Sequence, residues 1–243
     1  MTDTARPAPY IDDLLSTRRA QATPWLIWHS HEGERIELSG RVFDNWVAKS
    51  ANLLMDLPAL NPGDTVVLDL PTHWKSLVLA FAIWHHGAVL TTPDDELATE
   101  AVLWVSTDPN DARIPPAAEI LAVNLASLAL AFDGDLGPVA EDYTALVRSF
   151  ADSFSASALP GHLTALAAGS TKLSLAEICN GDRKEQGTVA LNGALPLPEV
   201  LPWIVERFAA GDSIVLLGEQ VELSDSLRSS EGIGSEYGFA QKN

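Results

Sequence analysis

The chain has 243 residues, of which 47% are hydrophobic, and a formal net charge of −18 at pH 7. This length and composition predict one large α/β domain with a substantial core. Nucleic acid and an anionic membrane surface are excluded as partners, since both require clustered Lys and Arg and the basic residues here form only isolated pairs. The single cysteine, Cys179, excludes an intrachain disulfide.

No segment of the sequence predicts export or membrane insertion. The first nine residues lack a basic stretch followed by an apolar core, so they do not resemble a signal peptide. No apolar run approaches the ~18–20 residues that a transmembrane helix needs. We therefore expect a cytoplasmic protein with a flexible arm over residues 1–9, a single α/β domain over residues 10–230 and a frayed tail over residues 231–243.

The first elements follow from short local patterns. Residues 11–19 predict a short helix, and the apolar runs at 25–28 and 36–38 predict a β-hairpin around a glycine-containing turn. Ser39 is suited to cap the next helix, because its hydroxyl can accept a free backbone N–H. That helix is expected over residues 41–56, whose apolar side chains recur at helical spacing.

The segment 61–92 predicts the centre of the fold. An apolar run at 65–70 is followed by a helical pattern at 74–86 and a second apolar run at 88–92. Two short strands separated by one helix are typical of a parallel βαβ crossover. The strand runs are apolar throughout, as in a sheet covered on both faces. The predicted fold class is therefore α/β, a mostly parallel sheet with helices on both faces.

The remaining elements are predicted with less regular spacing. Strands are expected at residues 101–105, 120–125, 163–168, 188–191 and 213–217, and helices at 139–154, 174–180, 197–210 and 222–228. The helix at 139–154 rests on a stripe of large apolar residues at helical spacing. Glycine at the end of the 197–210 segment is expected to stop that helix.

This order of elements resembles the N-terminal subdomain of the adenylate-forming (AMP-binding) enzymes, which include acyl-CoA synthetases, nonribosomal-peptide adenylation domains and luciferases. The matching motif residues are Pro62, Gly63, Asp64, Val66, Gly87 and Ala88. The resemblance is good over residues 20–92, weaker to residue 217 and absent beyond. More narrowly, the segments NWVAKSANLL and PTHW resemble an uncharacterised actinobacterial family of short proteins.

The resemblance implies an ATP site on a Ser/Thr/Gly-rich phosphate loop, whose backbone N–H groups hold the phosphates. The equivalent place here is the segment after Leu166, where Gly169, Ser170, Thr171 and Lys172 stand before Ser174. These residue types have phosphate-loop chemistry, but the segment is too short to be that loop. A plain capping turn that joins a strand to its helix is the favoured interpretation.

Two further features of the adenylate-forming family are not matched. Tyr237 and Gly238 begin a segment similar to the family's magnesium motif, but Gln241 stands where the family has Glu, and the spacing is too short. The family's C-terminal domain with its catalytic Lys has no counterpart. These losses predict a non-catalytic, truncated relative that binds a small ligand or a protein, with a homo-oligomer left open. The alternative is a divergent nucleotide- or acyl-CoA-dependent ligase-like enzyme with a rebuilt site.

Ligands of open parallel sheets bind beyond the carboxyl ends of the strands. There the sequence offers candidate ligand-binding residues with hydroxyl groups, a backbone turn and one cation that suit a small anion: Thr72, Gly169, Ser170, Thr171 and Lys172. We predict no catalytic residue, no cofactor and no metal. His29 and His31 can share one face of a strand, but no Cys or carboxylate set stands at ligand spacing.

Overall fold

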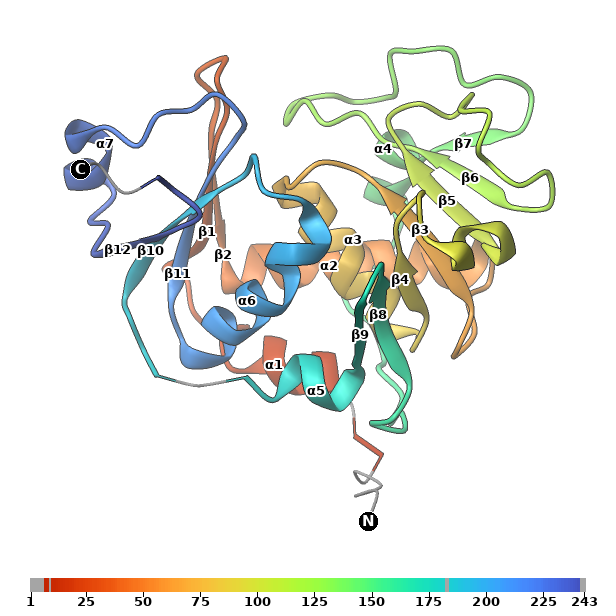
Figure 1. Cartoon of the computed structure of the whole chain (residues 1–243), viewed down its shortest axis with the longest axis horizontal. Coiled ribbons are helices and arrows are strands. Elements are labelled where there is room, and N and C mark those ends of the chain that lie inside the picture. Colours follow the sequence, from red (N-terminus) through yellow and green to blue (C-terminus); the bar gives the residue numbers. More distant parts are fainter. Residues whose placement is uncertain (1–6, 9, 182–183, 241–243) are drawn as a thin grey trace.

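The computed structural model describes residues 7–8, 10–181 and 184–240, and its strands form two sheets (Figure 1). The first sheet contains, in spatial order, β12 (Ser235–Tyr237), β10 (Thr188–Asn192), β11 (Ser213–Leu217), β1 (Pro24–His29) and β2 (Arg35–Ser39). The second contains β7 (Ala140–Asp142), β6 (Glu119–Ala122), β5 (Leu103–Ser106), β3 (Thr65–Asp69), β4 (Val89–Thr91), β8 (Thr164–Ala168) and β9 (Thr171–Ser174). In the described parts of the chain, β1–β2 and β8–β9 pair antiparallel and all other neighbouring strands run parallel.

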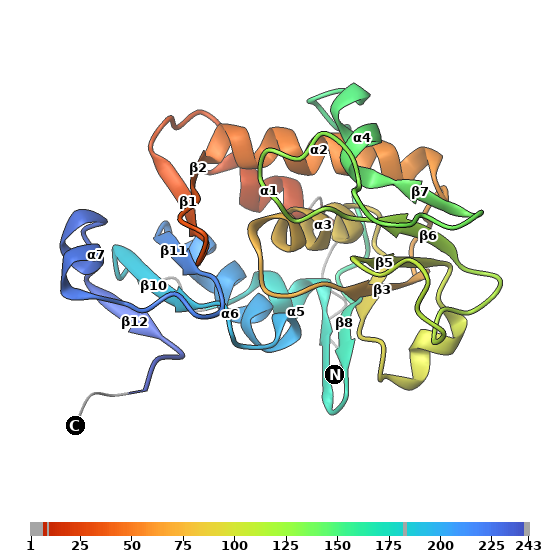
Figure 2. The ribbon, with the colours of Figure 1, turned by 90° about the horizontal axis from the view of Figure 1, so that it is seen from above.

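A layer of helices lies between the two sheets (Figure 2). It consists of α1 (Tyr10–Ser16), α2 (Gly40–Asp56), α3 (Trp74–His85), α5 (Leu175–Cys179) and α6 (Leu197–Ala210). Outside this layer lie η1 (Glu96–Glu100), α4 (Tyr143–Leu146), η2 (Val147–Ser149) and α7 (Asp225–Ser230). The predicted α/β class with mostly parallel strands is confirmed, and the strands divide into two sheets that share one helical layer. No helix in the described ranges is both long and apolar enough to cross a membrane.

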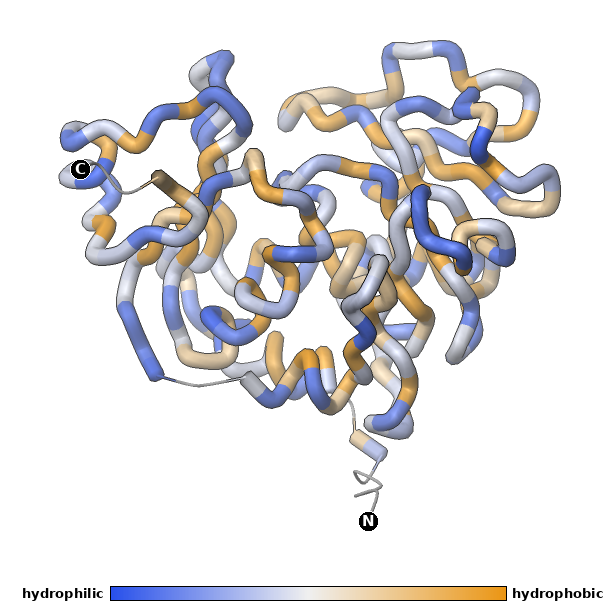
Figure 3. Tube along the Cα trace, viewed as in Figure 1, coloured by the Kyte–Doolittle hydropathy of each residue, from blue (hydrophilic) through white to orange (hydrophobic). Residues whose placement is uncertain are grey.

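Helix α3 is the centre of the core, and all 12 of its residues are buried. The strands on either side of it, β3 and β4, pair in parallel with Val66 opposite Leu90, so the predicted βαβ crossover is confirmed. The Phe81 ring lies 5.4 Å from the Phe43 ring on α2 and 6.1 Å from the Phe208 ring on α6. The helix is buried on all sides because it packs against α1, α2, β3 and β4, and its Phe81 ring contacts α6. Figure 3 shows that α3 is mostly hydrophobic, whereas the tip of the β1–β2 hairpin is hydrophilic.

Local capping signals fix the ends of the other helices as predicted. The Ser39 hydroxyl accepts the backbone N–H of Val42 at 3.3 Å, which starts α2. Helix α6 ends at Gly211, which adopts φ +91°, a left-handed conformation that costs glycine little. The hairpin of β1 and β2 is also confirmed.

The prediction of a helix over residues 139–154 is wrong. The segment forms β7, α4 and η2 in turn and continues without regular structure. Its carbonyl groups are taken by side chains of α2: Lys49 Nζ donates to the Phe150 carbonyl, and Asn52 Nδ2 donates to the Ala151 carbonyl at 3.0 Å. The apolar stripe therefore packs on the core without the backbone continuing as a helix.

The described part of the predicted frayed tail, residues 231–240, contains an ordered strand instead. Strand β12 pairs with β10, and Ile233 is buried against the outer face of the first sheet together with Leu227 and Phe239. That face is apolar, so the C-terminal segment covers it. Of the predicted arm, Ala8 forms two backbone hydrogen bonds with Leu159, while residues 1–6 and 9, like residues 241–243, lie outside the described residues.

Candidate functional site

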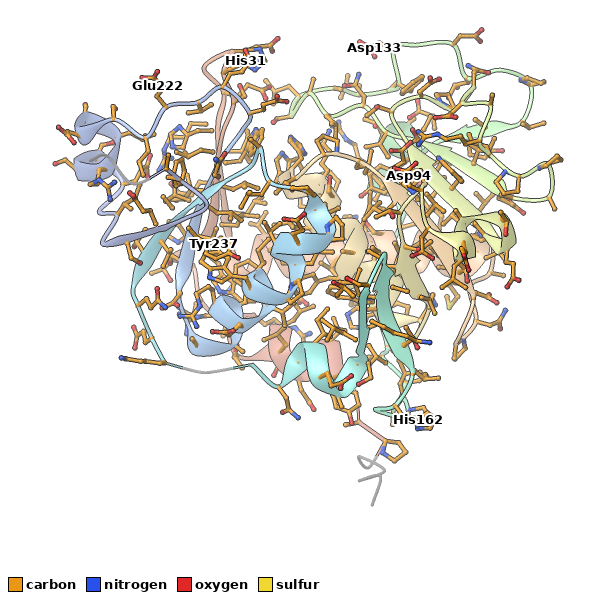
Figure 4. The ribbon with its side chains drawn as sticks, in the orientation of Figure 1. His31, Asp94, Asp133, His162, Glu222 and Tyr237 are labelled. Carbon is orange, nitrogen blue, oxygen red and sulfur yellow. The ribbon has the colours of Figure 1, made fainter. Side chains whose placement is uncertain are left out.

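A crevice of about 770 Å³ opens between the two sheets at the carboxyl ends of their strands. We call it the crevice. Its lining comes from six segments, within residues 28–34, 68–73, 92–94, 124–126, 193–198 and 218–220. His31, on the β1–β2 hairpin, and Asp94, beyond β4, lie on opposite sides of it (Figure 4). Both sheets therefore contribute strand ends to one site, as expected for ligand sites of parallel sheets.

The walls of the crevice are mostly apolar and include one neutral imidazole. Trp28, only 7% exposed, packs edge-on to the His73 ring with 4.5 Å between ring centroids. His73 caps α3, and its Nδ1 accepts the Lys75 N–H at 3.1 Å. Burial lowers the pKa of His73 to about 3, so the ring is uncharged at pH 7 and carries its proton on Nε2.

The charged groups that line the crevice are carboxylates. They are Glu32, Glu34, Asp69, Asp94 and Glu219, and the described lining contains no Lys or Arg. Just outside the lining, Arg113 Nη2 lies 3.3 Å from Asp69 Oδ2. Burial raises the pKa of Asp69, and the nearby Arg113 opposes this shift. The potential in the crevice therefore disfavours polyanions and favours uncharged or cationic groups.

Several polar contacts hold the two walls together. The Thr72 hydroxyl donates to the Leu195 carbonyl at 2.6 Å, and the Ser127 hydroxyl donates to Glu34 Oε2 at 3.0 Å. At Gly193 an added Cβ would lie 2.5 Å from the Leu217 carbonyl oxygen, so the β10 and β11 ends approach too closely for any other residue. The crevice is therefore formed before any ligand binds.

Lys75 holds the lining segment 124–126 in place through hydrogen bonds to its backbone. Its ammonium group donates to the Asn124 carbonyl at 2.6 Å and to the Ala126 carbonyl at 2.8 Å. Burial lowers the pKa of Lys75 to about 8. Sequence reasoning missed Lys75 and His73, although both lie close to Thr72, which was predicted as a strand-end residue.

Thr72 is the one predicted ligand-binding residue that lines the crevice. It is 3% exposed, and its hydroxyl is already donated to Leu195. The structure therefore gives the Thr72 side chain a role in joining the walls.

The other predicted residues, Gly169 to Lys172, lie outside the crevice lining. The expectation of a capping turn between a strand and a helix is wrong, because β8 and β9 form a tight antiparallel hairpin at this place. The backbone N–H of Gly169 donates to Asp95 Oδ2 at 3.0 Å. The Gly169 N–H therefore already donates to a carboxylate, whereas a phosphate bound at this turn would need that donor. The helix start predicted at Ser174 is confirmed by a capping box with Glu177.

Two other sequence motifs have packing roles in the structure. His29 Nε2 lies 2.9 Å from Glu231 Oε1, which joins β1 to the C-terminal segment. The Tyr237 ring stacks on Trp203 with 4.6 Å between centroids, and Gln241 lies outside the described residues. In the ranges that the structure describes, no three His, Cys, Asp or Glu side chains gather as metal ligands do.

Solved structures with the same fold include acyl-CoA synthetases. The Brucella canis acyl-CoA synthetase matches with a TM-score of 0.76 and 13% identity, over 94% of this chain and 47% of that chain. The chain has the fold of the N-terminal subdomain of acyl-CoA synthetases. The N-terminal domain of Mycobacterium tuberculosis FACL13 shares this subdomain fold, with a TM-score of 0.64 and 16% identity over 92% of this chain and 61% of that chain.

A Mycobacterium tuberculosis fatty acyl CoA synthetase matches with a TM-score of 0.67 and 15% identity, over 93% of this chain and 48% of that chain. The chain thus spans about half the length of these two synthetases. In sequence, a TIGR03089 family protein of Mycobacterium tuberculosis (strain ATCC 25618 / H37Rv) is 46% identical over 56 residues, 23% of either protein. This relative is consistent with the predicted actinobacterial family. No protein-family model matches the chain.

Proposed function

We propose that the chain is a non-catalytic relative of the AMP-binding enzymes that binds a small ligand in the crevice. The observation that carries this proposal is a cavity of about 770 Å³ at the strand ends whose charged lining is carboxylate. This volume lies within the ~300–1,000 Å³ typical of small-molecule sites. The site keeps the position where ligands of parallel sheets bind and lacks the charge that nucleotides require.

The lining defines the chemistry of the ligand. Trp28, Leu70 and Leu195 offer apolar surface, and the His73 Nε2–H offers an uncharged donor. Asp94 and Glu219 at the rim favour a positive charge. The ligand is therefore a compact molecule with an apolar body and an uncharged or cationic polar group.

The structure of the β8–β9 hairpin supports a non-catalytic role. Adenylation depends on donors and cations that stabilise the charge of a polyphosphate as it reacts. The hairpin replaces a phosphate loop, and its Gly169 N–H is bound to Asp95. The described lining of the crevice contains no Lys or Arg, so no permanent cation there provides that stabilisation.

A thermal-shift screen tests the proposal directly. The panel contains aromatic and aliphatic amines, the matching amides, ATP-Mg and CoA. We expect amines or amides to raise the melting midpoint, since a ligand at 100 times its Kd adds about 2.7 kcal/mol of stability. ATP-Mg and CoA should have no effect. A shift with ATP-Mg or CoA would favour the alternative, a divergent nucleotide- or acyl-CoA-dependent ligase-like enzyme with a rebuilt site.

Two variants place the response in the crevice. Ala194→Trp fills the mouth from an exposed lining position and should abolish the shift. Asp94→Asn removes one rim charge and should weaken amines more than amides, whereas Glu100→Gln, at an exposed position of η1 outside the lining, should change neither. No response to any amine or amide would leave binding of a protein partner as the better account.

A further inference from the structure

A smaller cavity of about 280 Å³ lies between α2 and η2, and we call it the α2 cavity. Its lining consists of Val42, Asn45, Trp46 and Lys49 from α2 and Arg148 from η2. The four α2 positions are spaced i, i+3, i+4 and i+7, so they form one face of the helix.

The α2 cavity is basic in a chain that is strongly acidic. The sequence has 33 Asp and Glu against 15 Lys and Arg, yet two cations and no carboxylate are found in the described lining. Lys49 and Arg148 come from elements almost a hundred residues apart. Their convergence is a product of the fold, and it creates a local positive potential that an anion can use.

Both cations are held in place before any ligand binds. Lys49 Nζ donates to the Phe150 carbonyl at 2.5 Å and to the Arg148 carbonyl at 3.4 Å, and Arg148 Nη2 donates to the Ala129 carbonyl at 2.6 Å. An ammonium group has three N–H donors and a guanidinium group five, so Lys49 keeps one donor and Arg148 several for a ligand. Because these long side chains are already ordered, a ligand loses less side-chain entropy when it binds.

The rest of the lining suits an apolar group. The Trp46 ring is fixed by the Trp74 ring, whose centroid lies 5.5 Å away at 69°. Val42, 39% exposed, adds an aliphatic surface at the mouth. Asn45 adds an amide to the lining.

We propose that the α2 cavity is a second binding site, for a small aromatic or short-chain carboxylic acid. The carboxylate lies between Lys49 and Arg148, and the apolar part contacts Trp46 and Val42. Arg and carboxylate form charge-assisted, often bidentate hydrogen bonds, which give such a site its preference for planar acids. This site is independent of the crevice and of the function proposed for it.

Calorimetric titration of the full chain with benzoate tests the proposal, with benzamide as the uncharged isostere. We expect benzoate to bind and benzamide to bind at least about tenfold more weakly, because the amide lacks the charge that the two cations attract. No heat of binding with benzoate up to about 10 mM would overturn the proposal.

A charge-changing variant locates the site. Asn45→Asp is isosteric and leaves α2 intact, since a carboxylate four positions before Lys49 forms a favourable i, i+4 pair with it. It places a negative charge in the lining and should weaken benzoate about tenfold or more. Met55→Glu, on an exposed position of α2 outside the cavity, changes the net charge equally and should leave the affinity unchanged.

Two further variants distinguish the α2 cavity from the crevice as the place where benzoate binds. Arg148→Gln keeps an amide donor for Ala129 and should weaken benzoate at least about fivefold. Ala194→Trp, which fills the crevice, should not affect benzoate. Binding that survives both Asn45→Asp and Arg148→Gln, or that is lost in Ala194→Trp, would contradict the proposal.

Discussion

The crevice and the α2 cavity share one helical layer and carry opposite charge. Five carboxylates and no Lys or Arg line the described part of the crevice, whereas Lys49 and Arg148 line the α2 cavity. The net charge of −18 alone would predict an acidic surface everywhere. The comparison teaches that the few side chains that the fold brings together determine which ligand a cavity favours. The net charge of the chain does not predict the charge of an individual cavity.

The largest expected loss of stability concerns the helical layer that forms part of both the crevice and the α2 cavity. Phe81 is fully buried between α2 and α6, so Phe81→Ala should cost roughly 3–5 kcal/mol of unfolding free energy in urea melts. Met55→Ala, at an exposed position of α2, should cost less than about 0.5 kcal/mol. A loss below about 1 kcal/mol for Phe81→Ala would mean that α3 does not pack as described.

His73 is the group that would add positive charge to the crevice on acidification. Its pKa is lowered to about 3 in the folded chain, below the ~6.5 of an unfolded histidine. The unfolded state therefore binds the proton first, so stability is complete above about pH 6.5 and is lost as the pH falls toward 3. At pH 5 this histidine alone should cost roughly 2 kcal/mol relative to pH 7.

His73→Asn tests this pH dependence, because Asn also caps helices but does not titrate. Burial also lowers the pKa of His85, to about 4, and that of His86, so the variant should reduce the slope between pH 7 and 5 without removing it. If the variant left the pH dependence of the unfolding free energy unchanged, the claim that His73 is buried in its neutral form would be contradicted.

The contact between Thr72 and Leu195 should have a smaller effect. Thr72→Val preserves the shape of the side chain and leaves the Leu195 carbonyl without its 2.6 Å hydrogen bond, at a cost of about 1 kcal/mol. The matched control is Thr171→Val on the exposed β9, where the change should be near zero. Equal losses of stability at the two positions would contradict the claim that the Thr72–Leu195 hydrogen bond holds the two walls of the crevice together.

The smallest effect is expected at the β8–β9 turn. Lys172 is exposed and lies outside the crevice, so Lys172→Ala should leave the affinity for a crevice ligand unchanged. Anion binding by Gly169, Ser170, Thr171 and Lys172 stays a prediction, which calorimetry with inorganic phosphate can test in the same variant. Phosphate binding to the wild type that Lys172→Ala weakens by about 1.5–3 kcal/mol would make the turn a site in its own right.

Local patterns were sufficient to predict the elements around α3. The βαβ unit, the β1–β2 hairpin and α6 each follow from apolar periodicity and a nearby cap such as Ser39 or Gly211. The failure at residues 139–154 has a non-local cause, because Lys49 and Asn52 capture carbonyl groups about a hundred residues further along the chain. Strand β12 was missed for a related reason, since it forms by pairing with β10, about 45 residues earlier in the chain.

The candidate site could be predicted only in outline. The strand-end rule pointed to Thr72, which lines the crevice, and ligand binding at this place stays a prediction. Which strand ends meet depends on how the two sheets share the helical layer, and no local pattern records this. The buried state of His73 and the bond from Gly169 to Asp95 are likewise consequences of tertiary packing.

Pyrophosphate exchange with ATP-Mg and a broad panel of carboxylic acids tests the central claim most directly. The claim is that this fold, with a hairpin in place of a phosphate loop and a crevice lined by carboxylates, binds a ligand without adenylating it. We predict exchange at the background level for every acid. Exchange that depends on the acid and is lost in Ala194→Trp would show an active nucleotide site in the crevice and would contradict the account.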